Sequence, residues 1–126
     1  MHGIIAMLYR IRNAKQHDEA SRTLWFTDKY FDLIVWLDDT ERIASFQLVY
    51  DKIANPRAIT WSEAGGYLHE IVDEGDVPHG HDMTPILLPD GDFDASAIAD
   101  RFKRHAAEID PSIADFVYRK LIDYTE

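Results

Sequence analysis

Three histidines near the middle of the chain are the residues whose types and spacing best suit metal chemistry. His79 and His81 stand two positions apart in a polar segment flanked by Asp76 and Asp82, and His69 precedes them. Imidazole and carboxylate groups are ligands for zinc, nickel and non-haem iron, and a loop can wrap around such an ion. The spacing matches no recognised metal-binding motif. A divalent transition metal on His69, His79 and His81 is therefore one hypothesis, and a solvated loop is the favoured alternative.

A metal at these histidines would suit a metal-dependent hydrolase, with Glu70 or Asp73 as the base. Other catalytic signatures are missing from the sequence. It contains no cysteine, no Gly-x-Ser-x-Gly nucleophile motif and no phosphate-binding glycine motif. The sequence therefore leans away from an enzyme, and no cofactor is expected apart from that metal.

A predicted hairpin supplies the second candidate site. Residues 30–37 and 43–50 are rich in aromatic and β-branched side chains, and five polar residues join them. Side chains alternate between the two faces of a strand. One face then collects core residues, namely Phe31, Leu33, Val35, Phe46 and Leu48. The other face mixes apolar and polar residues, namely Asp32, Ile34, Trp36, Ile43 and Gln47, and Tyr50 and Trp61 are candidates to join it.

This mixed face allows three interpretations. An apolar lining with a few hydrogen-bonding groups is typical of a pocket for a small-molecule ligand. Exposed tryptophan and tyrosine are also typical of an interface with a second copy or with a protein partner. Packing of the N-terminal segment over the face is the third interpretation. Between the first two, the sequence favours the interface.

The flanking segments predict how this hairpin is built into a fold. Shorter strand-like runs lie at 24–27, 57–62, 67–73 and 83–88, with turn residues between them. Two amphipathic helices follow, the first capped by Asp94 and the second by Asp110 with Pro111 after it. The sequence therefore predicts an α+β fold: an antiparallel β-meander of about five to six strands followed by two C-terminal helices packed on one sheet face.

Length and composition indicate one domain over residues 1–126. Within it, residues 1–22 are the candidate for a loosely attached N-terminal segment. The first apolar run is too short for a membrane span, which needs about 20 residues, and its flanking charges do not suit a secretory signal. A chain without cysteine fits a reducing compartment. A cytoplasmic protein without membrane contact is expected.

Charge narrows the choice of partner. The net charge is −10, and residues 23–100 hold 16 acidic against four basic side chains. Such a field repels phosphate backbones, so nucleic-acid binding is not expected. The leading hypothesis is a small acidic interaction module that acts as a homodimer or binds a protein partner. The alternatives are the hydrolase at His69, His79 and His81, and an acidic inhibitor or immunity-type protein of a basic partner.

Overall fold

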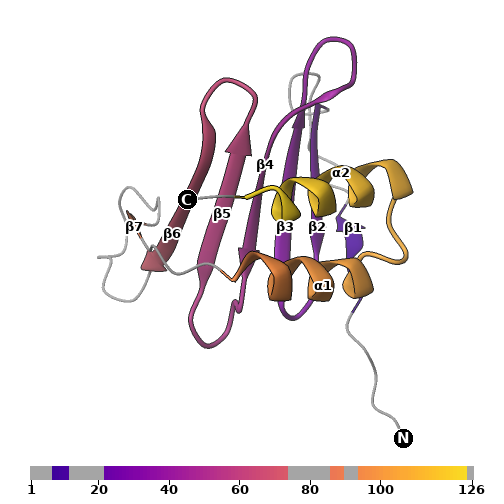
Figure 1. The fold of residues 1–126 in the computed structure, drawn as a ribbon. Helices are drawn as coiled ribbons and strands as arrows, with labels where there is room; N and C mark the ends of the chain where they lie inside the picture. The colour runs from indigo at the N-terminus through magenta and orange to yellow at the C-terminus, as the bar shows by residue number, and fades with distance from the viewer. Residues whose placement is uncertain (1–6, 12–21, 74–85, 90–93, 125–126) are drawn as a thin grey trace, which may run out of the picture.

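The computed structural model describes residues 7–11, 22–73, 86–89 and 94–124. Their strands form one antiparallel sheet in which each strand pairs with its neighbours in sequence. The strands are β1 (Tyr9–Ile11), β2 (Thr23–Thr27), β3 (Phe31–Leu37), β4 (Ile43–Tyr50), β5 (Arg57–Ser62), β6 (Gly66–Asp73) and β7 (Ile86–Pro89). Helices α1 (Ala95–His105) and α2 (Pro111–Ile122) follow, side by side on one face of the sheet (Figure 1). The predicted α+β class is confirmed, and the short edge strands β1 and β7 bring the sheet to seven strands.

The core lies between the helices and the sheet face beneath them, which we call the helix-side face. Alternation along β3 and β4 buries the expected residues there, because every second side chain meets the helices. The sheet contributes Phe31, Leu33, Val35, Phe46 and Leu48, each fully buried. The helices contribute Ile98, Phe102, Ala106, Ile109, Ile113, Val117 and Leu121. Burial of one large apolar side chain is worth about 1.5–3 kcal/mol, so these two layers hold the fold together.

Both helices begin where the sequence predicts. The carboxylate of Asp94 accepts a hydrogen bond from the Ala97 backbone N–H at 3.1 Å. Asp110 accepts one from the Ser112 N–H at 2.9 Å, and Pro111 occupies the first turn of α2, where no backbone donor is needed. Neither helix in the described part of the chain has the length and apolar character required to cross a membrane.

A register shift interrupts the central hairpin. Trp36 pairs with Ser45, whereas Leu37 pairs with Ile43, so Ala44 is an extra residue on β4. Such a bulge reverses the alternation of side chains between the two sides of the extra residue. The Ile43 side chain consequently packs against the core on the helix side. Its predicted place on the mixed face beside Trp36 is wrong, because strict alternation across a regular hairpin takes no account of a bulge.

Part of the N-terminal segment is integrated into the domain. Leu8 is fully buried in the core, and its backbone N–H donates to the His105 carbonyl at 2.8 Å. β1 then pairs with β2, placing Ile11 opposite Trp25. Residues 7–11 are thus attached to both layers, while the remainder of the predicted loose segment, apart from Arg22, lies outside the described residues.

Two aspartates, Asp38 in a turn and Asp110 at a helix cap, make the stability of the fold sensitive to acid. Hydrogen bonds from the Thr40 side chain and from the Arg42 and Thr40 backbones hold the pKa of Asp38 below its ordinary value of 3.8. The backbone and side chain of Ser112 hold the pKa of Asp110 below the same value.

We expect both carboxyls to titrate below pH 3.8 in a carboxyl-carbon NMR titration of the folded protein. A depressed folded pKa means that the stability these groups add is complete above pH 3.8 and is lost as pH falls through the folded pKa values. Titration of either carboxyl at or above 3.8 would contradict the hydrogen-bonded turns described here.

Candidate functional site

The sheet face opposite the helices, which we call the outer face, carries most of the predicted interface residues. Cross-strand pairing arranges its side chains in rows. One row consists of Ile11, Trp25, Ile34, Gln47, Thr60 and Leu68, from β1 to β6. A second row on the same face consists of Tyr9, Thr27, Asp32, Val49, Ala58 and Glu70. A third contains Thr23, Trp36, Ser45, Ser62 and Gly66.

Large apolar side chains are exposed along this face. The exposed fractions are Tyr9 61%, Leu68 52%, Trp25 45%, Ile11 42% and Trp36 38%. Single exposed apolar residues are common on protein surfaces, but a contiguous group usually marks an interaction site. Pairing makes Ile11, Trp25 and half-buried Ile34 direct neighbours, and Trp36 is on the same strand as Ile34. The outer face is therefore the strongest binding surface in the described part of the molecule.

Its polar groups are mostly engaged with one another. The Gln47 side-chain amide donates to Thr60 Oγ1 at 3.2 Å. The Lys52 ammonium lies 2.9 Å from Asp32 Oδ1 and 3.1 Å from Thr27 Oγ1. Because these polar groups already have partners within the chain, the exposed apolar side chains are the groups that would gain most if a second surface covered them.

Two other predicted interface residues lie on the helix-side face. Tyr50 pairs with Phe31, and Trp61 pairs with Phe46, so both point towards the helices. The Trp61 ring packs edge-on against Phe116 of α2 with centroids 5.4 Å apart. The structure therefore brings Asp32, Ile34, Trp36 and Gln47 together on the outer face, but not Tyr50 and Trp61.

The described part of the predicted metal cluster is His69 alone, because His79 and His81 lie outside the described residues. His69 is buried on the helix-side face, and its Nε2 lies 2.6 Å from the Tyr50 hydroxyl. Glu70, proposed as a base, is the next residue on the strand and lies on the outer face. The sheet separates these two side chains, so they do not share a site. Among the described residues, no group of three or more His, Cys, Asp or Glu side chains is placed to hold a metal ion.

Sequence reasoning missed a buried acid–imidazole pair. Asp28 Oδ2 lies 2.7 Å from His105 Nδ1, across 77 positions of sequence, and both side chains are buried. Asp28 Oδ1 also accepts backbone hydrogen bonds from Tyr30 at 2.8 Å and Phe31 at 2.7 Å. The pair resembles the acid–base unit of some hydrolases, but the Phe31 ring packs edge-on against His105. We assign the Asp28–His105 pair a structural role: it links the β2–β3 turn to the end of α1.

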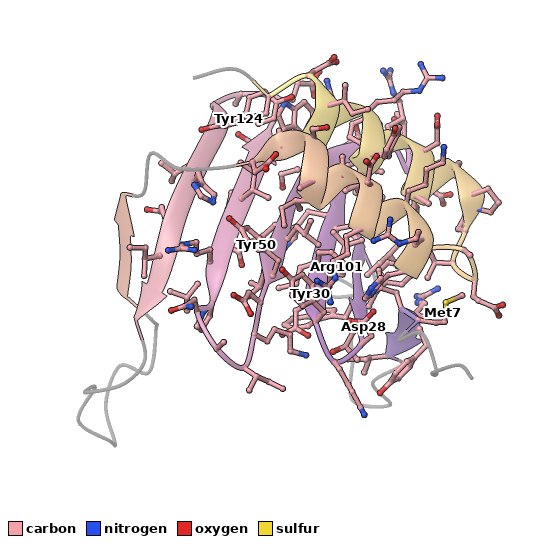
Figure 2. All side chains as sticks on the ribbon, turned by 60° about the horizontal axis from the view of Figure 1, so that its bottom comes forward. Met7, Asp28, Tyr30, Tyr50, Arg101 and Tyr124 are labelled. Carbon is pink, nitrogen blue, oxygen red and sulfur yellow. The ribbon has the colours of Figure 1, made fainter. Side chains whose placement is uncertain are left out.

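Tyr30 and Arg101 lie beside this pair, as Figure 2 shows. The Arg101 guanidinium carbon is 3.6 Å from the centroid of the Tyr30 ring, a cation–π contact. Burial raises the pKa of Tyr30 above 10.0; Arg101 opposes this shift and Asp51 adds to it. The phenol therefore stays protonated at neutral pH, and the contact serves to hold α1 on the sheet.

A shallow groove of about 290 Å³ lies on the helices, lined by residues that include Lys103, Pro111, Asp115 and Tyr118. The Lys103 ammonium lies 5.1 Å from the centroid of the Tyr118 ring, so this lysine already contacts another residue that lines the groove. The groove is small and lacks convergent free polar groups in the described structure, so the outer face remains the stronger candidate.

The fold and this surface define an α+β protein with a helix-covered sheet face and an apolar outer face. No protein-family model, curated protein or solved structure matches the chain.

Proposed function

We propose that this protein is a non-enzymatic interaction module that acts as a homodimer joined through the outer face of its sheet. The observation that carries the proposal is the group of large apolar side chains exposed on that face, from Tyr9 to Leu68. Aromatic side chains are enriched at protein interfaces because they bury a large area at small entropic cost. Packing of two sheets face to face, about 10 Å apart, is a common way to bury such surfaces.

Charge favours a second copy over a basic partner as the occupant. The chain carries a net charge of −10, but only Asp32 and Glu70 are acidic among the outer-face strand residues that the structure describes. Lys52 pairs with Asp32, which removes half of that local charge. A basic partner would be attracted to the acidic surfaces elsewhere. The outer face can instead meet its own copy with little like-charge repulsion, as a two-fold interface requires.

The test replaces the two outer-face tryptophans. We expect Trp25→Ser and Trp36→Ser each to weaken the dimer by about 2 kcal/mol, or about 30-fold in Kd, because buried tryptophans act as anchors of an interface. Sedimentation equilibrium measures the Kd, and thermal unfolding at low concentration checks that the monomer still folds. Ile122→Ser on α2 is the matched control: it removes an apolar side chain that is 50% exposed but far from the outer face.

Fluorescence gives an independent measurement. The chain contains three tryptophans, and Trp61 is the one on the helix-side face. In a Trp61→Phe variant, emission comes only from Trp25 and Trp36, so dimer formation should shift it to shorter wavelength as concentration rises. A wild-type protein that sediments as a monomer at high micromolar concentration would refute the proposal.

A further inference from the structure

Residues 7–11, which we call the edge segment, contain β1 and are held to the molecule mainly by one side chain. β1 is the shortest strand of the described sheet, lies at its edge (Figure 1), and has all three side chains exposed. Leu8, the residue before it, is fully buried, and the Leu8 N–H donates to the His105 carbonyl at 2.8 Å. A short ladder with β2 is the other main attachment in the described structure.

This attachment is weak compared with the cost of ordering the segment. Every residue that is fixed loses backbone freedom, whereas Leu8 alone in the edge segment gains full burial of a large apolar side chain. Segments with so little burial open locally without unfolding of the remaining domain. We therefore expect the edge segment of the monomer to exchange between an attached and a detached state.

The edge segment also carries part of the proposed interface. Tyr9 and Ile11 are two of the five large apolar side chains exposed on the outer face of the described sheet. Pairing places Ile11 beside Trp25 and Tyr9 beside Thr27. Detachment of β1 removes both side chains from this face and leaves Trp25 on the edge strand. The apolar group is thus complete only while the edge segment is attached.

We propose that attachment of the edge segment through Leu8 completes the dimer interface and thereby controls dimer formation. The inference rests on the proposed homodimer and adds the step that regulates it. Leu8 packs in the core on the helix side of the sheet, so it is a positioning residue that acts through Tyr9 and Ile11.

Two quantitative consequences follow from this control. Both copies must have the edge segment attached, so the Kd of the dimer rises with the square of any loss in the attached fraction. The coupling between attachment and association is also reciprocal, because both are equilibria of the same molecule. Dimer formation must therefore stabilise the attached state of the edge segment.

Leu8→Ala tests the control, with Leu121→Ala as the matched variant. We expect Leu8→Ala to raise the Kd at least about tenfold in sedimentation equilibrium while changing Tm little, because only the edge segment detaches. Leu121 is also a fully buried leucine, but it follows Lys120, whose carbonyl accepts from the Tyr67 hydroxyl of β6. Leu121→Ala should lower Tm strongly and leave the Kd unchanged at temperatures where it is folded. Leu8→Met keeps most of the buried volume and should restore association.

Amide hydrogen exchange of the wild-type protein supplies a measurement that needs no variant. In the dilute monomer the Leu8 amide should exchange much faster than the amides of the β3–β4 ladder, and its protection should rise with concentration as dimers form.

Three results would overturn the control by the edge segment but leave the homodimer standing. They are a Leu8 amide as protected in the monomer as those of β3 and β4, an unchanged Kd in Leu8→Ala, and a fall in Tm in Leu8→Ala as large as in Leu121→Ala. A wild-type protein that stays monomeric at high concentration would overturn both the homodimer and its control.

Discussion

Replacement of Asp28 by alanine should lower the free energy of unfolding by about 3–5 kcal/mol, because it leaves several buried donors without an acceptor. The Asp28 carboxylate accepts from the backbone N–H groups of Tyr30 and Phe31 and lies 2.7 Å from His105 Nδ1. Chemical denaturation of the variant measures the loss.

Asp38→Ala is the matched control. Asp38 also accepts two backbone hydrogen bonds in a turn, from Thr40 and Arg42, but that turn is exposed to water. Water can replace the carboxylate there, so the effect should be much smaller. A double-mutant cycle with His105→Ala should give a coupling energy above about 1 kcal/mol. Equal losses of stability in Asp28→Ala and Asp38→Ala would contradict a structural role for the buried pair.

Phe102→Ala is the second large prediction, with an expected loss of about 3–5 kcal/mol and a fall in Tm of about 10–20 °C. Phe102 is fully buried, and its ring meets Phe31 edge-on with centroids 5.8 Å apart. The substitution leaves a cavity between α1 and the sheet. Asp100→Ala, on the exposed side of α1, should change stability by less than about 0.5 kcal/mol.

Phe102→Ala also tests whether the core and the proposed interface are independent of each other. The Kd of the proposed dimer should stay unchanged at temperatures where the variant is folded, because Phe102 lies on the opposite side of the sheet from Trp25 and Trp36. The tryptophan variants should show the reverse pattern, with weak association and a monomer of normal stability. Loss of association in Phe102→Ala at such temperatures would contradict a dimer that uses the outer face alone.

The fold class could be predicted because local patterns determine it. Alternation along β3 identified Phe31, Leu33 and Val35 as core, and the four-residue spacing of Ile98 and Phe102 puts both on the buried side of α1. Each of these patterns spans less than one strand or helix. A period of two or of about 3.6 residues states directly which side of an element is buried.

The surfaces were harder to predict because they depend on register. The bulge at Ala44 moved Ile43 to the helix side, and nothing in the local pattern indicates a bulge there. The residues of β5 do not by themselves give its register, so Trp61 was only a candidate for the mixed face; its pairing with Phe46 places it on the helix-side face. His105 did give a signal: it follows Phe102 by three positions and so falls on the apolar stripe. A polar residue on that stripe requires a buried partner, but only the folded structure identifies Asp28 as that partner.

The order of the elements along the chain also has a consequence for synthesis in the cell. All seven strands in the described part of the chain precede its two helices, so the sheet leaves the ribosome before the segment that covers its core face. Between the last residue of β7 and the last residue of α2 lie about 33 residues, which take about 2–7 s to translate. During that interval Phe31, Val35 and Phe46 have no helix to pack against. Apolar side chains are then exposed on both faces of the sheet. The nascent chain is therefore at greatest risk of aggregation, and most in need of chaperones, before α1 and α2 emerge.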